Sequence, residues 1–220
     1  MQIAREGQTW YAKLSDGASV PFDDGKVKSF EERLAGADLE DTFVPRYETG
    51  PTKIENRAQH DPGRFRSESF LKSLYGLPPA RGDRVRIPFL GTGLTVHRAL
   101  GGPLARVERR LASAVAQRPE LARWLRRFGG VYNPRNVAGT ERPSAHAYGI
   151  ALDLDPSQGH YWRWDHPRRT SWSHQLPQEI VDAFEAEGFI WGGRWYHYDT
   201  FHFEYRPELL DARCWAPDGG

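Results

Sequence analysis

Two short segments of alternating apolar and polar residues restrict the fold of this chain more than any other feature. In residues 150–155 (IALDLD) the large apolar side chains share one face of a strand, and Asp153 points to the other face. In residues 200–205 (TFHFEY) the aromatic side chains share one face, and His202 lies on the opposite one. If the two strands pair in one sheet, His202 faces the polar side of the first strand, where Asp153 lies.

A second histidine precedes the first of these strands. Along one straight strand His146 and Asp153 would be about 23 Å apart, so they can share an ion only if the chain reverses between them. Gly149 can supply that reversal because glycine tolerates positive φ. Two imidazoles and one carboxylate with an open fourth position are the ligand set of a catalytic zinc site. Asp199, three residues before His202, is then a candidate general base.

Each of these residues also has an ordinary structural interpretation. A single histidine on a strand usually has a structural role, and Asp199 could be a turn residue that bonds to its own backbone. Four other histidines, in aromatic or proline-rich segments, are expected at the surface or beside the site: His160, His166, His174 and His197. The combination favours a metal site, because each of two alternating strands delivers a ligand type to its polar face.

The composition excludes several classes of protein. The single cysteine, Cys214, cannot form an internal disulfide and removes every multi-cysteine zinc or iron–sulfur site. Any metal must therefore be bound by carboxylates and by some of the eight histidines. With 30 Lys and Arg against 29 Asp and Glu, the net charge of +1 disfavours binding to nucleic acid or to an anionic membrane. No signal peptide and no membrane-spanning segment is visible, so we expect a soluble chain; a chain that had lost its leader would look the same.

The chain divides into two parts by composition. Residues 1–60 are polar and show no sustained period, and all five lysines fall before residue 73. We therefore predict an irregular N-terminal arm in residues 1–60, laid over a folded domain in residues 61–220. Within that domain the pattern predicts a helix over 66–76, a hairpin over 84–100, two helices over 103–128 that are interrupted at Pro119 and ended by Gly129 and Gly130, a helix from Pro177 to Gly188, and a strand over 189–191. Helices that flank short alternating strands indicate an α+β fold with a small antiparallel sheet.

At the candidate ligands the sequence resembles a known peptidase family. SAHAYGIALD, at 144–153, fits the pattern Ser-x-His-x-x-Gly-x-Ala-x-Asp, and DTFHFEY, at 199–205, fits the pattern Asp/Glu-x-x-His. Both patterns are those of the zinc D-alanyl-D-alanine carboxypeptidases and dipeptidases. This family is a branch of the metallopeptidases with the hedgehog/lysostaphin-type α+β fold, and it includes phage endolysins that cut L-alanyl-D-glutamate bonds. The resemblance covers about residues 60–212.

The resemblance implies roles for individual residues. Zinc would be bound by His146, Asp153 and His202, and Asp199 would be the catalytic base. Arg135, in the segment before the first motif, would hold the substrate carbonyl or the developing oxyanion. We also expect Ser144 and Trp195 to contact the substrate. Many members of the family have Glu where this chain has Asp199, and Asp occurs in the endolysin-like branch, so the choice of cleaved bond stays open.

The predicted function is hydrolysis of peptide bonds in peptidoglycan stem peptides, of the D-alanyl-D-alanine carboxypeptidase type, with a periplasmic or extracellular place of action. An L-alanyl-D-glutamate endopeptidase is the first alternative. A metal-containing wall-binding module without activity would not need Asp199. A non-haem iron oxygenase also uses two histidines and a carboxylate, but usually with His-x-Asp spacing, whereas here six residues separate His146 from Asp153. The long connection over 156–176 could form an aromatic wall of the site or serve packing alone.

Overall fold

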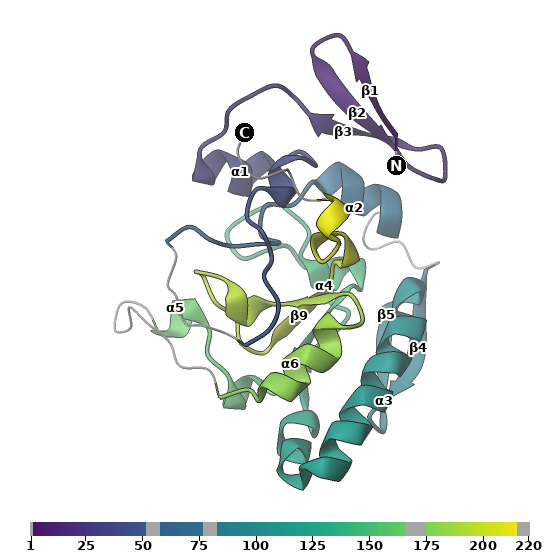
Figure 1. The fold of residues 1–220 in the computed structure, drawn as a ribbon, viewed down its shortest axis with the longest axis vertical. Helices are drawn as coiled ribbons and strands as arrows, with labels where there is room; N and C mark the ends of the chain where they lie inside the picture. The colour runs from purple at the N-terminus through teal and green to yellow at the C-terminus, as the bar shows by residue number, and fades with distance from the viewer. Residues whose placement is uncertain (1, 52–57, 77–82, 166–174, 215–220) are drawn as a thin grey trace.

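A four-stranded antiparallel sheet forms the centre of the part of the chain that the computed structural model describes, residues 2–51, 58–76, 83–165 and 175–214. Its strands lie in the order β6 (Phe128–Gly130), β7 (Ala151–Leu154), β9 (His202–Tyr205) and β8 (Phe189–Trp191). Helices pack beside this sheet (Figure 1). The α+β class with a small antiparallel sheet is confirmed.

One face of the sheet is covered by α6 (Gln178–Glu185), and α3 (Gly101–Gln117) packs beside α6 (Figure 1). Phe184 of α6 stacks on Phe203 of β9 with 4.1 Å between the ring centroids, and Phe89 packs against the same helix residue. Both helices carry apolar residues at intervals of three and four, and these residues are buried. The apolar face of α6 therefore packs on β9, the strand that carries His202, and holds it in place.

The segment after α3 differs from its prediction. Residues Pro119–Leu125 form a 3-10 helix instead of a second α-helix, with Pro119 in its first turn. Gly129 and Gly130 do not end a helix but belong to β6, which pairs with β7. The apolar spacing of Leu121, Trp124 and Leu125 suits both helix types, because residues three apart share one side of a 3-10 helix.

The other predicted elements are confirmed. The helix α2 (Glu68–Tyr75) starts after Ser67, whose hydroxyl accepts a hydrogen bond from the Phe70 N–H, and ends at Gly76 with φ of 73°. The hairpin is a separate two-stranded sheet of β4 (Arg84–Phe89) and β5 (Thr92–His97). Short helices complete the described chain: η1 (Asp41–Phe43), η2 (Arg98–Leu100), α4 (Ala145–Tyr148), η4 (Pro156–Gln158), α5 (Trp162–Asp165), η5 (Gly192–Arg194), η6 (Pro207–Leu209) and η7 (Ala212–Cys214).

The first 60 residues are not irregular, which corrects the prediction for this segment. They contain a three-stranded antiparallel sheet of β1 (Gln2–Glu6), β2 (Thr9–Lys13) and β3 (Ser19–Asp23), followed by α1 (Phe30–Gly36). Most side chains of β1 are exposed, so burial of one face does not impose an alternation of apolar and polar residues on its sequence. The division of the chain at residue 60 stays a prediction.

The N-terminal segment is nevertheless tied to the central sheet. The buried Tyr47 hydroxyl donates to Glu185 at 2.5 Å and accepts from the backbone N–H of Trp191 at 2.7 Å.

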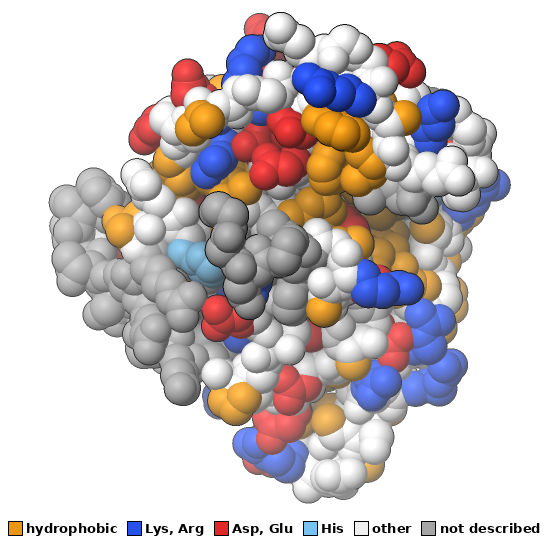
Figure 2. Space-filling view, turned by 45° about the horizontal axis from the view of Figure 1, so that its top comes forward, with side chains coloured by type: hydrophobic (Ala, Val, Ile, Leu, Met, Phe, Trp, Pro, Cys, Tyr) orange, Lys and Arg blue, Asp and Glu red, His pale blue; other side chains and the backbone are white. Residues whose placement is uncertain are grey.

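Basic side chains occur in small groups with acidic ones among them on the face shown in Figure 2. Among the described residues, no helix has both the length and the apolarity needed to span a membrane.

Candidate metal centre

Three side chains from different elements bring their ligand atoms together beside the central sheet. The His146 Nε2 atom lies 3.2 Å from the His202 Nδ1 atom. The Asp153 Oδ1 atom lies 2.8 Å from that Nδ1 atom and 3.3 Å from that Nε2 atom. In a tetrahedral zinc site with bonds of about 2.0 Å, neighbouring ligand atoms are about 3.3 Å apart. The three atoms therefore have the spacing of three corners of such a site.

Strand pairing places two of the three ligands. In the antiparallel pair of β7 and β9, Asp153 lies directly opposite His202. Side chains opposite each other in such a pair point to the same face with their Cβ atoms about 5 Å apart. This confirms the prediction that His202 faces the polar side of the strand that carries Asp153.

The third ligand reaches the site through a turn at Gly149. His146 lies on the one-turn helix α4, which ends at Gly149 with φ of 71°, in the left-handed region. A Cβ atom at position 149 would lie 2.8 Å from the backbone nitrogen of His97, so a side chain there would clash as well as strain the backbone. The hydroxyl of Ser144, which is buried, caps this helix by accepting from the Ala147 N–H at 3.3 Å.

The strand β6 controls the orientation of His146 and the space beside Asp153. The Nδ1–H group of His146 donates to the Val131 carbonyl, which directly follows β6, at 2.7 Å. That bond leaves the Nε2 lone pair free to bind a metal. A Cβ atom at Gly130 would lie 3.3 Å from the Asp153 Oδ2 atom, so a side chain here would crowd the carboxylate. Neither the Val131 carbonyl nor the close approach at Gly130 is predicted from the sequence, in which Gly129 and Gly130 indicate the end of a helix.

A buried carboxylate faces the second nitrogen of His202. The Glu204 Oε1 atom lies 4.0 Å from His202 Nε2, and Glu204 is flanked by Arg66 and Arg206, each with a nitrogen 3.7 Å from a carboxylate oxygen. Burial opposes ionisation of Glu204, yet His202 and the two arginines lower its pKa to about 2. Glu204 is therefore an anion that favours a proton on Nε2 of His202, which leaves Nδ1 as the ligand atom.

The electrostatics of the three ligands suit a cation. Burial raises the pKa of Asp153, but the two neighbouring imidazoles outweigh it and hold the pKa below its usual range. In turn the pKa of His202 rises to about 10 against the effect of its burial, because Asp153 and Glu204 surround it with negative charge. An ionised carboxylate and two imidazoles match the ligand preferences of zinc and similar divalent ions. The residues present therefore fit a bound zinc ion.

Asp199 has the properties of a proton acceptor near neutral pH. Burial and the charge of Asp153 raise its pKa to about 7, although His202, Arg64 and Arg135 act in the opposite direction. Its Oδ1 atom is buried and has no hydrogen-bond partner among the described residues. The backbone N–H of Asp199 donates to the Gly192 carbonyl at 3.0 Å, which holds the residue in place. A carboxylate with a free oxygen and this pKa can act as a general base.

The residues expected to contact substrate lie around the same site. Arg135 is exposed, on the segment between β6 and α4, and its charge is felt by Asp199. Trp195 is largely buried, with its ring centroid 5.6 Å from that of His202 and its Nε1–H donating to the Pro62 carbonyl. Arg64, which has no sequence motif, also lies here, because its guanidinium packs over the Trp195 ring.

The remaining histidines and aromatic residues have other partners. His197 bonds to the carboxylate of Asp61 at 2.6 Å, and His160 lies 3.3 Å from the carboxylate of Asp165. His166 and His174 lie outside the described residues. Trp164 is 63% exposed and stacks on Phe201, so this tryptophan lies against the turn just before His202.

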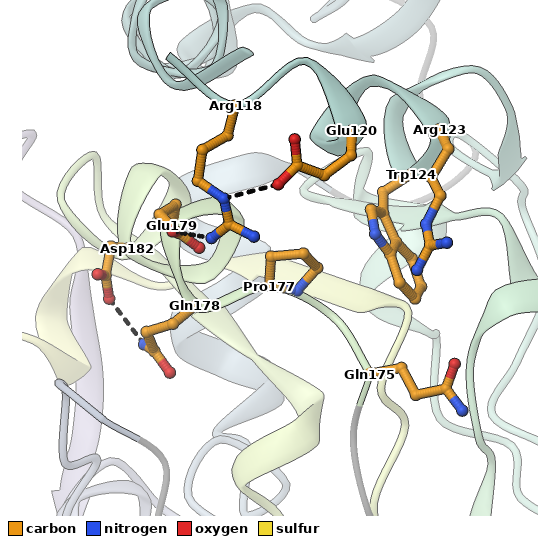
Figure 3. A pocket seen from close by; sticks show the side chains of 9 residues that line it. All are labelled: Arg118, Glu120, Arg123, Trp124, Gln175, Pro177, Gln178, Glu179 and Asp182. Carbon is orange, nitrogen blue, oxygen red and sulfur yellow. Dashed lines mark hydrogen bonds and ion pairs between the residues drawn. The ribbon is translucent and has the colours of Figure 1, made fainter.

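A cavity of about 740 Å³ lies elsewhere, between the 3-10 helix η3 (Pro119–Leu125) and the start of α6 (Figure 3). Its lining contains none of the three candidate ligands. Arg118 pairs with Glu120 and Glu179 across it, and Gln178 bonds to Asp182. These charges are satisfied by one another, which distinguishes the cavity from the metal centre.

Comparison with known proteins agrees with the two motifs. Residues 138–205 match the model of a family described as D-alanyl-D-alanine carboxypeptidase. The matched segment contains His146, Asp153, Asp199 and His202, and Arg135 lies three residues before its start. The resemblance to this family is confirmed. No curated protein and no solved structure matches the chain.

Proposed function

We propose that this peptidase of the D-alanyl-D-alanine carboxypeptidase kind depends on zinc and hydrolyses peptide bonds in the stem peptides of peptidoglycan, at a D-alanyl-D-alanine terminus. The observation that carries the proposal is the convergence of three ligand atoms beside an aspartate with a free oxygen. If peptidoglycan is the substrate, the protein acts outside the cytoplasmic membrane.

The metal would be held by His146 Nε2, Asp153 Oδ1 and His202 Nδ1. When bound, zinc supplies Lewis-acid chemistry, which polarises the substrate carbonyl and makes water more acidic. The chain holds these ligand atoms ready through the Val131 carbonyl and Glu204, which fix the orientations of the two imidazoles.

Asp199 performs the proton transfers. Its carboxylate accepts a proton from the water that attacks the peptide carbonyl, and it then delivers that proton to the leaving amine. A pKa of about 7 allows both steps near neutral pH, since the group is neither fully protonated nor a very weak base there. Arg135 holds the carbonyl oxygen as negative charge develops on it.

The test is hydrolysis of D-Ala-D-Ala-ended peptides and of intact sacculi, with and without a chelator, followed by mass spectrometry of the muropeptides. We expect loss of one terminal alanine, complete inhibition by the chelator and recovery on addition of zinc. Unchanged hydrolysis in chelator would overturn the zinc mechanism.

An L-alanyl-D-glutamate endopeptidase is the second candidate. Asp199 favours it, because Asp in place of Glu occurs in the endolysin-like branch of the family that the motifs resemble. The same digestion separates the two, since an endopeptidase releases the stem from its L-alanine instead of removing the last residue. A wall-binding module would bind sacculi and change no mass, and iron with oxygen uptake would instead indicate an oxygenase.

A further inference from the structure

Arg64 lies beside the metal centre with most of its hydrogen-bonding capacity unused. A guanidinium carries five N–H donors. Within the described part of the chain, the Arg64 guanidinium makes one hydrogen bond, from Nη1 to the His197 carbonyl, and this bond is long at 3.4 Å. Burial lowers the pKa of Arg64, but an arginine guanidinium stays protonated in proteins, so the group is a cation.

Two described arginines whose side chains are largely buried, Arg194 and Arg66, have carboxylates beside them, and Arg64 has none. Arg194 bonds to both carboxylate oxygens of Glu185, at 2.6 and 3.0 Å. Arg66 donates to the Pro143 carbonyl and lies near Glu204. No carboxylate among the described residues lies within 4.0 Å of the Arg64 guanidinium. A partly buried cation that lacks such a partner is costly to the fold, and this cost is characteristic of a group that serves a ligand.

The acid whose charge acts most strongly on Arg64 is Asp61, and its carboxylate is already bonded to another residue. Asp61 accepts from the His197 backbone N–H at 2.8 Å and from its Nδ1 at 2.6 Å. The Arg64 backbone N–H donates to the Asp61 carbonyl at 3.0 Å, so the main chain holds Arg64 in place while its guanidinium is left without a carboxylate.

Arg64 is separated from a metal ligand by one side chain. Its guanidinium carbon lies 5.9 Å from the centroid of the Trp195 ring, and the same ring lies 5.6 Å from that of His202. The Trp195 Nε1–H donates to the Pro62 carbonyl, two residues before Arg64, which locks the indole against this segment. Arg64 therefore borders the space in which a peptide on the metal would lie.

The balance of charge in this space favours an anion. With both imidazoles neutral, the carboxylates of Asp153 and Asp199 balance one divalent ion. Arg64 and Arg135 then add two positive charges that no described carboxylate pairs with. A site of this composition attracts a negatively charged part of a substrate.

We propose that Arg64 binds a free carboxylate on the residue that follows the cleaved peptide bond; this rests on the proposed function. Arg64 and His202 contact the same Trp195 ring, so we assign Arg64 to the part of the substrate next to the residue on the metal. In a D-Ala-D-Ala terminus this group is the chain end, and in an L-alanyl-D-glutamate bond it is a carboxylate of the glutamate. The fork of a guanidinium matches either group with two parallel hydrogen bonds.

The experiment compares matched substrates that differ only in that carboxylate. Zinc-loaded wild type and Arg64→Gln are assayed on an acetylated D-Ala-D-Ala peptide as free acid and as C-terminal amide, and on an L-Ala-D-Glu peptide with free and amidated α-carboxyl. We expect wild type to prefer one of the acids over its amide by between about tenfold and a hundredfold in kcat/KM, and Arg64→Gln to reduce that ratio to near one. The substrate that shows the preference identifies the source of the carboxylate.

Two further variants separate recognition from structure. Arg64→Lys keeps the charge but loses the fork, so its ratio should fall between those of wild type and Arg64→Gln. Arg123→Gln is the matched control: Arg123 is exposed and stacks over Trp124 at 4.9 Å, at the cavity of Figure 3, and its loss should leave the ratio unchanged. Because both substrates are tested on the same sample, partial unfolding cannot mimic a change in the ratio.

Binding provides a readout without turnover. In zinc-loaded Asp199→Asn protein, calorimetry should show that adding Arg64→Gln weakens binding of the acid peptide by at least about tenfold and leaves the amide unchanged. An equal acid-to-amide ratio in wild type and Arg64→Gln would overturn the assignment while the peptidase activity stands. Binding of the acid through Arg64 without any cleavage would overturn the proposed function alone, and no binding of either peptide would overturn both.

Discussion

Side chains that could bind a metal lie in two clusters of the described part of this protein, and the clusters differ in what neutralises them. The N-terminal cluster consists of two carboxylate groups that share Asp38, one with Asp23 and Asp24 and the other with Glu40 and Asp41. The Lys28 ammonium lies 3.1, 2.8 and 2.7 Å from oxygens of Asp24, Asp38 and Asp41. At the second cluster, formed by His146, Asp153 and His202, the Asp153 carboxylate pairs with the two histidines and with no described lysine or arginine.

Proximity of acidic groups alone does not make a metal site. In the N-terminal cluster the chain supplies its own cation, and the pKa of Lys28 is raised because three carboxylates outweigh its burial. In the second cluster imidazoles replace two carboxylates and the positive charge must come from outside the chain. We call the first the lysine-filled cluster and the second the metal centre.

The largest effect is expected from removing a ligand of the metal centre. His202→Ala should reduce zinc content from about one ion per chain to nearly none and lower kcat/KM by about a thousandfold or more, because Lewis-acid stabilisation is lost. Metal analysis after dialysis and a peptide assay measure both. Retained zinc in this variant would show that the ligands are wrongly assigned.

The next effect comes from the proton acceptor. Asp199→Asn should lower kcat by a factor of about 10² to 10⁴ while zinc content stays near one ion per chain, since Asp199 is not one of the converging ligands. Steady-state kinetics and metal analysis on the same sample separate the two. Loss of zinc together with activity would instead make Asp199 part of the ligand set.

A substitution in the lysine-filled cluster should lower the stability of the fold and leave catalysis unchanged. The Lys28 side chain is only 9% exposed, and Lys28→Met would leave Asp38 and Asp41 buried without it. We expect a loss of about 3 kcal/mol in the free energy of unfolding, partly limited by Arg33, which still pairs with Asp41. Urea denaturation measures this loss. Zinc content should not change, and a fall in zinc content would mean that the two clusters are not independent.

A smaller effect is expected from the carboxylate behind His202. Glu204→Gln keeps the size of the side chain but removes the charge that favours a proton on Nε2. Such a change should weaken zinc binding by between about tenfold and a hundredfold. Competition with a chromogenic chelator measures the affinity. Glu208→Gln is a suitable control, because Glu208 also bonds to Arg206 but does not face His202.

The last effect concerns the pH dependence of the metal-free protein. The pKa of Asp199 is raised from 3.8 to about 7 in the folded state, so its contribution to stability is present below pH 4 and is lost as pH rises through 7. Asp199→Asn lacks this loss. In chelator, the free energy of unfolding of the variant relative to wild type should therefore increase between pH 4 and 8 by a few kcal/mol, at about 1.4 kcal/mol per pKa unit. A difference that does not depend on pH would contradict the raised pKa.

The strand pairing of the metal centre could be predicted because alternation places Asp153 and His202 on definite faces, and one register brings them opposite each other. The reversal at Gly149 was also predictable, because His146 could not otherwise approach Asp153. The helix α4 was not foreseen, since four residues carry too little periodicity to reveal a helix.

The supporting residues could not be found in the sequence. Val131 contributes a backbone carbonyl, which has no sequence signal. Arg64 lies more than 80 residues before His146, in a segment without a motif, and only the packing of Trp195 brings it to the site. The three N-terminal strands escaped prediction because their largely exposed faces do not require alternation.

The most direct test of the account is a crystal structure of zinc-soaked protein with anomalous data at the zinc edge. We expect one strong peak at about 2.0–2.2 Å from His146 Nε2, Asp153 Oδ1 and His202 Nδ1, and none within the lysine-filled cluster. A peak among Asp24, Asp38 and Asp41, or no peak between the two histidines and Asp153, would contradict it.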